Sequence, residues 1–376
     1  MQRRAFVRTG LAAALLNTGV PVSLHALTSR STRLRSPADP VRLSSNENPL
    51  GIPDSARAAI VEALAQGHRY PQLNGELRGR IAARNGVEPA NVVLGNGSAE
   101  ILQMTVQAMS VGGRNVRVVL PDPTFEQVER YARAMGADVR KVPLLPDHTH
   151  DIQRMRDAAA RADGPVLAFI CNPNNPTGTI TSCDTVAAWI AGAPPNVWFL
   201  IDEAYLEFVT AAGYRPMVRE AMAREHVLVS RTFSKIYGLA GIRLGYGIAA
   251  QETARTINTF AAATNINHLA AAAALACIDD QPFIRKSLET NRRGLEVAYA
   301  TFDELGIAYL PSHANFVLHG VRGDLDTYIA RMREEGIRVG RPFPPMTAFN
   351  RVSIGLPEEM DAWAAALKRL HARGSA

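Results

Sequence analysis

The sequence predicts an α/β protein with a large domain built on a mostly parallel sheet and a smaller C-terminal α+β domain. Short apolar runs alternate with helix-like segments through most of the chain, and each run is followed by turn-forming residues. Near residue 265 this alternation stops and longer helical patterns begin. Apolar runs separated by helices are typical of strands that are buried on both faces of a parallel sheet.

The alternation places the expected elements in order along the chain. We expect strands at 92–94, 116–120, 166–170, 197–201 and 227–229, each leading into a helix. In the second domain we expect helices at 269–278, 283–305, 324–335 and 358–371, with short strands at 316–318 and 352–354. The predicted division is therefore a leader and linker at 1–35, a large domain with an N-terminal arm at 36–262, and a small domain at 263–376.

The charge of the chain is concentrated in its first residues. The 376 residues carry a formal net charge of +6, and residues 1–35 hold six arginines with no aspartate or glutamate. The remainder is therefore neutral, which argues against nucleic-acid binding. Three cysteines are too few for a disulfide scaffold. The chain has four lysines, so chemistry that needs a neutral amine has four candidates.

The first residues resemble an export signal. Paired arginines at 3 and 4 precede an apolar run at 11–16, which is too short to span a bilayer as a helix. This pattern is typical of a twin-arginine signal peptide, so we expect export to the periplasm. An ordinary basic terminus on a cytoplasmic protein is the alternative. In either case we expect no stable membrane association.

Polar residues follow the predicted strands, where ligands bind in open α/β sheets. A small-residue turn with Ser98 precedes a helix and offers free N–H groups to an anion. Asp202 follows an apolar strand, and Lys235 lies in a turn rich in serine and threonine. An amine, a carboxylate and an anion cradle are the groups that pyridoxal phosphate requires. The remaining members of this predicted set are Asn175, Tyr205, Thr232, Ser234 and Arg243.

The histidines at 148 and 150, flanked by Asp147 and Asp151, look like metal ligands at first sight. They lie in a polar segment bordered by proline, and we find no further ligand cluster in the sequence to complete a site. We therefore interpret this segment as a solvated loop and expect no metal.

The motifs NPNNPTG (172–178), DEAY (202–205), SRTFSK (230–235) and NRVSIG (350–355) resemble those of the fold-type I aminotransferases. Within that group the chain is most similar to the histidinol-phosphate aminotransferase family. SSNENPLG (44–51), HRYP (68–71), GNGSAE (95–100), LPDPTF (120–125) and TNINHLAAAA (264–273) match as well. The resemblance covers roughly residues 41–370, and the joint order of these motifs makes it specific.

The resemblance implies pyridoxal 5'-phosphate as cofactor and transamination between an amino acid and a 2-oxo acid. Lys235 would bind the cofactor covalently and move the substrate's α-proton, and Asp202 would pair with the pyridine nitrogen. Tyr205 and Asn175 would hydrogen-bond the ring oxygen, and Arg351 would bind the substrate carboxylate. A homodimer with a shared active site is implied, in which Tyr70 reaches the neighbouring subunit's cofactor. The further cofactor contacts implied are Phe125 on the ring and Ser98, Ala99, Thr232, Ser234 and Arg243 on the phosphate.

Structural alternatives exist for several of these residues. Asp202 would otherwise be a buried partner of Arg243, and Arg351 a surface strand residue. Tyr205 and Phe125 would be core aromatics, and Tyr70 a turn aromatic.

The sequence departs from the family pattern near the substrate. Position 99 is alanine where many relatives carry aspartate, and position 125 is phenylalanine where relatives often have tyrosine. The loop before Arg351 is shorter and richer in proline than expected for the histidine-pathway enzyme. Two alternatives are open for the substrate pocket. Either Arg338 or Arg341 binds a substrate phosphate, or the pocket suits an aromatic side chain. Two other functions stay open: a phosphoamino-acid decarboxylase on the same fold, and a cofactor-carrying binding protein without turnover.

Overall fold

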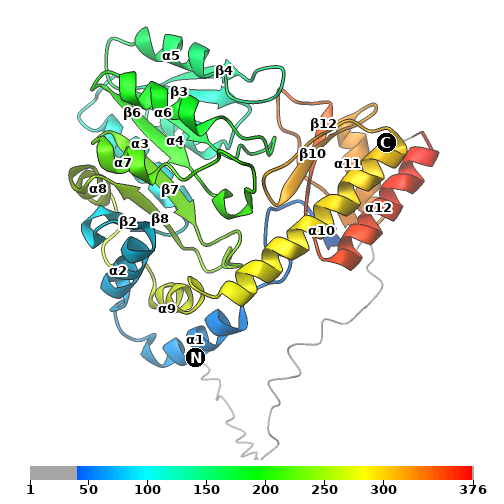
Figure 1. Cartoon of the computed structure of the whole chain (residues 1–376), viewed down its shortest axis with the longest axis horizontal. Coiled ribbons are helices and arrows are strands. Elements are labelled where there is room, and N and C mark those ends of the chain that lie inside the picture. The colour runs from blue at the N-terminus through cyan, green and yellow to red at the C-terminus, as the bar shows by residue number, and fades with distance from the viewer. Residues whose placement is uncertain (1–39, 375–376) are drawn as a thin grey trace, which may run out of the picture. The chain divides into compact units, whose positions relative to one another are not determined.

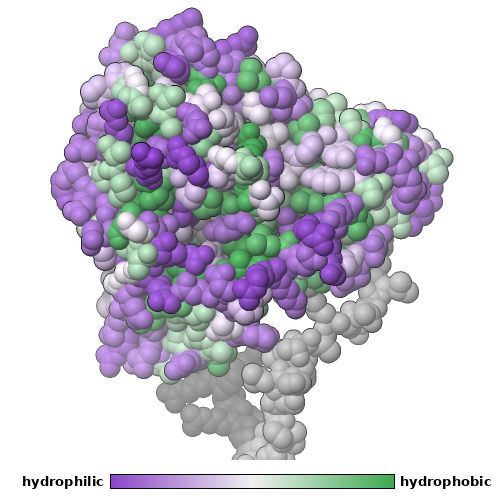
Figure 2. Space-filling view, in the orientation of Figure 1, coloured by the Kyte–Doolittle hydropathy of each residue, from purple (hydrophilic) through white to green (hydrophobic). Residues whose placement is uncertain are grey.

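The computed structural model describes residues 40–374, which belong to one compact unit. The predicted leader lies outside the described residues. Within them, a seven-stranded sheet is covered by helices, and a three-stranded sheet lies beside the long C-terminal helices (Figure 1). The predicted α/β class with a mostly parallel main sheet is confirmed. On the face shown in Figure 2, hydrophilic residues predominate with hydrophobic residues between them.

The main sheet contains all five strands predicted for it and two more. Its order is β2 (Val92–Gly95), β8 (Gly245–Ala249), β7 (Val227–Thr232), β6 (Val197–Asp202), β5 (Val166–Cys171), β3 (Arg117–Asp122) and β4 (Asp138–Pro143). Strand β8 is antiparallel to both of its neighbours, and the other pairs are parallel. The sequence missed β8 because two of its five residues are glycine, and it missed β4 because this edge strand is largely exposed and charged.

The sheet's helices follow from amphipathic patterns and from local caps. Asp151 and Ser182 cap the helices that they precede, each by accepting a hydrogen bond from a backbone N–H of the first turn. The helices around the sheet are α1 (Asp54–Ala63), α2 (Asn74–Asn85), α3 (Ser98–Ser110), α4 (Gln127–Ala134), α5 (Ile152–Ala160), α6 (Cys183–Gly192), α7 (Val218–Ala223) and α8 (Gln251–Asn258). Short 3₁₀ turns lie at Leu64–Gln66, Pro89–Asn91 and Leu206–Phe208.

The C-terminal part follows the prediction closely. It comprises α10 (Gln281–Leu305), β9 (Tyr309–Leu310), β10 (Phe316–Gly320), α11 (Leu325–Glu334), β11 (Ile337–Arg338), β12 (Phe349–Ser353) and α12 (Pro357–Ala372). Strand β10 lies between β12 and β9 in an antiparallel sheet, and β1 (Val41–Arg42) pairs with β11. Phe302, Tyr328 and Trp363 are buried in the core of this part. The N-terminal arm is thus attached to the C-terminal elements by a strand pairing.

Helix α9 (His268–Cys277) forms at the predicted position. We expected the small domain to begin at residue 263 and therefore to include this helix, but the helix packs on elements of the large domain. Its buried alanines share a core cluster with residues of α1, α2 and β2. Small side chains allow helices to approach closely, which suits this contact. The division at residue 262 stays a prediction, because the described residues belong to one compact unit.

In residues 40–374, none of the helices combines the length and the apolar character that crossing a membrane requires.

Candidate active site

One cavity of about 730 Å³ brings together almost all of the predicted site residues. It opens where β5, β6 and β7 end at their carboxyl edge and where the arm and β12 pass over that edge. The predicted residues that line it are Ser98, Ala99, Phe125, Asn175, Asp202, Tyr205, Thr232, Ser234, Lys235, Arg243, Arg341 and Arg351. Tyr70 does not line this cavity and is 79% exposed.

Asp202 is the last residue of β6 and is 2% exposed. Its Oδ1 atom is buried and has no hydrogen-bond partner among the described residues. Burial raises the pKa of this carboxyl to about 7, although the positive charge of Lys235 acts in the opposite direction. A buried acid with a free oxygen is therefore ready to accept a cationic donor from a ligand.

Lys235 follows β7 and extends into the same cavity. Its Nζ atom donates a hydrogen bond to the carbonyl oxygen of Asn46 at 3.0 Å and lies 5.6 Å from the centroid of the Tyr205 ring. Burial, followed by the positive charge of Arg351, lowers the pKa of the amine to about 8. A larger fraction of this amine is thus neutral and nucleophilic at physiological pH than of an ordinary lysine.

An anion cradle lies at the N-terminus of α3. Gly97 precedes this helix with φ of +80°, and the guanidinium of Arg243 lies against it. Arg243 donates to the main-chain oxygens of Ala240 at 2.7 Å and Asn96 at 3.3 Å. It does not pair with Asp202, so the alternative in which Asp202 is only a structural partner of Arg243 is wrong. A Cβ at Gly245 would collide with the backbone nitrogen of Ser98. Glycine at this position therefore lets the N-terminus of α3, with the free N–H groups that can bind an anion, lie close against β8.

The hydroxyl groups of Thr232 and Ser234 extend the cradle from the end of β7. The Thr232 hydroxyl donates to the Ser234 hydroxyl at 3.0 Å, and it accepts from the Ser234 backbone nitrogen at 3.1 Å. Both residues are buried. The sequence predicted this segment as a turn, whereas β7 continues through Thr232 and the turn begins after it.

Arg351 lies on β12 and is buried rather than on the surface. Its guanidinium donates to Asn175 Oδ1 at 2.7 Å and to the Ser44 oxygen at 2.9 Å. The rings of Phe316 and Phe343 lie 5.4 and 4.8 Å from its central carbon. Burial lowers its pKa to about 10, so the group remains a cation at neutral pH. A guanidinium that lies against two aromatic rings in a cavity is suited to bind a carboxylate or a phosphate.

The arm contributes residues to the cavity whose roles the sequence did not reveal. Asn46 donates to the Tyr205 hydroxyl at 2.9 Å, accepts from Lys235, and accepts from Ser353 at 2.8 Å. The Asn175 amide also donates to the Tyr205 hydroxyl, at 3.4 Å. Tyr205 is therefore held by polar contacts in the cavity wall and is more than a core aromatic. The only sequence signal for Asn46 was the motif at 44–51.

The outer wall of the cavity carries an ion pair between Arg341 and Glu126 with an N–O distance of 2.5 Å. The Arg341 guanidinium also lies 4.3 Å from the centroid of the Phe343 ring. Phe125 and Ile329 add apolar surface nearby. This wall therefore offers both charge and aromatic surface to a ligand side chain.

His150, in the segment interpreted as a solvated loop, is 2% exposed and lies beneath the turn that carries Asn175. Its backbone nitrogen donates to the Thr181 hydroxyl at 3.0 Å, and burial lowers the pKa of its ring to about 4. The solvated interpretation is wrong for this histidine, because the loop packs on the turn instead of extending into solvent. Within residues 40–374, no three histidine, cysteine or acidic side chains are placed to hold a metal ion.

These features fit pyridoxal 5'-phosphate. The free Oδ1 of Asp202 matches a protonated pyridine nitrogen, the glycine-lined helix N-terminus matches the phosphate, and Lys235 lines the same cavity as both. The volume of the cavity leaves room for a small substrate next to the cofactor.

Comparisons with known proteins agree with this geometry. Residues 38–367 match the family model for aminotransferase class I and II. Histidinol-phosphate aminotransferase 2 of Ralstonia nicotianae is 40% identical over 342 residues, which cover 89% of this chain and 90% of the relative. The histidinol-phosphate aminotransferase of Moorella thermoacetica is 38% identical over 88% of this chain and 86% of its own.

A solved structure shows the same fold. The histidinol-phosphate aminotransferase from Sinorhizobium meliloti, in complex with pyridoxal-5'-phosphate, superposes with a TM-score of 0.82 at 27% identity. The match covers 88% of this chain and 91% of that one. The chain therefore belongs to the class I and II aminotransferases and is a pyridoxal phosphate-dependent aminotransferase.

Proposed function

We propose that this enzyme transfers the amino group of an anionic amino donor to a 2-oxo acid, with histidinol phosphate or an aromatic amino acid as the donor. The observation that carries this proposal is the position of Arg351, which lines the same cavity as Lys235 and Asp202. Its guanidinium is oriented by Asn175 and Ser44, and it would bind the carboxylate of an amino acid or the phosphate of histidinol phosphate.

The cofactor supplies an electron-withdrawing ring that stabilises negative charge on the substrate's α-carbon. In our proposal Asp202 holds the proton on the ring nitrogen, while Tyr205 and Asn175 donate to the ring oxygen. Phe125 covers one face of the ring. The groups proposed to bind the phosphate are Ser98 and Ala99 through their backbone N–H groups, together with Thr232, Ser234 and Arg243.

Lys235 is proposed to take the proton from the substrate's α-carbon and to return one later at its Nζ atom. A general base must be neutral when it accepts the proton, and its pKa should lie near the working pH. Burial and the charge of Arg351 lower the pKa of Lys235 to about 8, which meets this requirement. The hydrogen bond from Nζ to Asn46 holds the amine within the cavity.

The outer wall is proposed to select the donor side chain. Arg341 is paired with Glu126 and stacked on Phe343, so an anionic side chain would have to compete with the Glu126 carboxylate, whereas an aromatic side chain would not. Arg338 lines the cavity as well and is a second candidate for an anionic side chain.

We also propose a homodimer in which Tyr70 reaches the cofactor phosphate of a second copy. Tyr70 is 79% exposed, and Ile52, Val61 and Leu64 are exposed apolar residues that precede it in the chain. Exposed apolar side chains on neighbouring elements are typical of protein interfaces. Export by the twin-arginine route remains our proposal for the location, and it rests on the arginines and apolar run of the leader.

The test is a set of amino donors added to the purified enzyme that has been loaded with pyridoxal phosphate. Histidinol phosphate, Phe, Tyr, Leu and Glu are compared by the loss of the cofactor's visible absorbance and by formation of the oxo product. We expect at least one donor to convert the cofactor to its amino form. Release of carbon dioxide without oxo product would instead indicate a decarboxylase, and the absence of any conversion would favour a binding protein.

A further inference from the structure

A buried ion pair lies directly behind the cavity. Glu203 follows Asp202 in the chain and is 1% exposed, and Arg231 precedes Thr232 on β7 and is 6% exposed. The Arg231 Nη2 and Nε atoms lie 2.8 and 2.9 Å from Glu203 Oε2. Each member of the pair is thus the immediate neighbour of a residue proposed to touch the cofactor.

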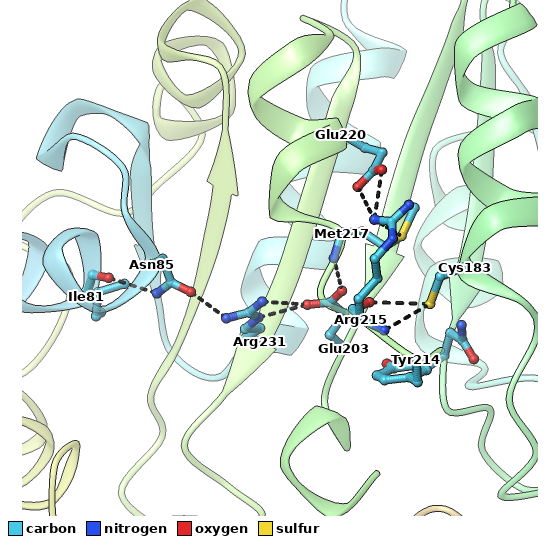
Figure 3. A network of polar contacts seen from close by, with 10 residues as sticks. Ile81, Asn85, Cys183, Glu203, Tyr214, Arg215, Met217, Glu220 and Arg231 are labelled. Carbon is cyan, nitrogen blue, oxygen red and sulfur yellow. Dashed lines mark hydrogen bonds and ion pairs between the residues drawn. The ribbon is translucent and has the colours of Figure 1, made fainter. Parts of the chain in front are cut away.

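The pair belongs to a chain of contacts that crosses several elements (Figure 3). The second carboxylate oxygen of Glu203 accepts the backbone N–H of Met217 at 2.7 Å. On the other side, Arg231 Nη1 donates to Asn85 Oδ1 at 2.6 Å, and the Asn85 amide donates to the Ile81 oxygen within α2 at 2.8 Å. The ion pair is therefore fixed at both ends by groups outside β6 and β7.

The backbone connects this pair to the groups in the cavity. Strands β6 and β7 are in register with Asp202 opposite Ser230, and the Glu203 N–H donates to the Ser230 oxygen at 2.8 Å. Successive residues of a strand point to opposite faces. Asp202 and Thr232 therefore face the cavity side, while Glu203 and Arg231 meet on the other side and hold the two strand ends at a set spacing.

The pair also balances charge beneath the site. Glu203 acts to raise the pKa of Asp202, and Arg231 places the opposite charge directly against Glu203. The other ionisable groups that face the pair, Asp202 or Lys235 are Tyr205, Glu207, Tyr246, Tyr214, Cys183, Cys171, Arg351, Glu47 and Arg243. The structure shows no salt bridge between any of these groups and either member of the pair.

From this geometry we infer that Glu203 and Arg231 form a positioning pair that sets the spacing of Asp202 from Thr232 and Lys235 and balances the charge behind the cofactor. This inference rests on the proposed function, because it assigns the pair a role toward a cofactor held by those residues. Removing one member leaves the other buried and unpaired. A remaining positive charge on Arg231 lowers the pKa of a protonated group near Lys235, and a remaining negative charge on Glu203 raises that pKa.

The experiment uses cofactor-loaded enzyme and measures the pH midpoint of the bound cofactor's visible absorbance together with thermal stability. Glu203→Gln keeps the size of the side chain and leaves a positive charge, so the midpoint is expected to fall by about one pH unit. Arg231→Met leaves a negative charge, so the midpoint is expected to rise. The double variant restores neutrality, and its midpoint is expected to return toward that of the wild type.

The control is Arg117→Met, which breaks a partly buried ion pair with Asp138 (2.8 Å) at the opposite, amino-terminal end of β3. We expect it to lower thermal stability without moving the midpoint. If Glu203→Gln lowers stability while its midpoint equals that of the wild type, the pair is merely structural and the inference fails. If Arg231→Met does not fold, the Glu203→Gln midpoint decides alone.

Failure of the proposed function would look different. In that case no amino donor would convert the bound cofactor to its amino form, while the midpoints of the wild type and of the variants could still be measured.

Discussion

Replacing Asp202 by asparagine should stabilise the cofactor-free protein while it disables the enzyme. The carboxyl is 2% exposed, its Oδ1 has no partner among the described residues, and burial raises its pKa from 3.8 to about 7. Since one pKa unit corresponds to about 1.4 kcal/mol, ionised Asp202 destabilises the folded cofactor-free state by about 4 kcal/mol above pH 7. Asparagine removes this penalty but buries an amide, which costs about 1–3 kcal/mol, so a net gain of about 1–3 kcal/mol is expected.

The raised pKa of Asp202 determines how the stability of the cofactor-free wild type depends on pH. Between about pH 4 and pH 7 the unfolded chain releases the Asp202 proton while the folded chain retains it, so wild-type stability falls as the pH rises. The advantage of Asp202→Asn should therefore grow by about 1.4 kcal/mol per pH unit over this range and stay constant above pH 7. Below about pH 4 both states hold the proton, and this part of the advantage should vanish.

The assay is urea unfolding of both cofactor-free proteins at pH 5, 6, 7 and 8, paired with transamination rates of the loaded enzymes. Asparagine cannot hold a positive ring nitrogen by charge, so the rate should fall by about 10²–10³-fold. A variant that is less stable than the wild type at pH 8, or a stability difference that does not change with pH, would refute the reasoning from the buried carboxyl.

Three further substitutions test the other parts of the site. Lys235→Ala should abolish transamination and leave the far-ultraviolet circular dichroism of the cofactor-free protein unchanged; remaining turnover would disprove its role. Arg351→Lys keeps the charge but loses the planar fork, so steady-state kinetics should show kcat/KM lower by about 10²-fold, mainly through KM, and an unchanged KM would contradict the assignment. Gly97→Ala places a Cβ against the Arg243 guanidinium at a positive φ, so cofactor titration should give a weaker Kd, and equal affinity would show that this turn does not form the phosphate cradle.

The sequence alone predicted the cofactor and the type of reaction, because the residues proposed to carry that reaction lie within local patterns. Asp202 directly follows an apolar strand, and Lys235 lies in a short polar turn, so each could be found without knowledge of the fold. The order of these motifs along the chain then indicated the fold and the cofactor. Five of the seven strands of the main sheet were predictable for the same reason, since each is a continuous apolar run.

The contacts that join these parts could be known only from the tertiary structure. Asn46 meets Tyr205 across 159 residues of sequence, and Arg351 meets Asn175 across 176, so no local pattern connects the partners. The sequence placed Arg231 in a turn, whereas it is a strand residue whose charge is matched by Glu203, which directly follows the neighbouring strand. Residue type and local periodicity are sufficient to predict a strand end or a reactive amine. Which buried charge faces which partner depends on how the strands pair and on where the arm crosses them, and that is decided by the packing of the whole chain.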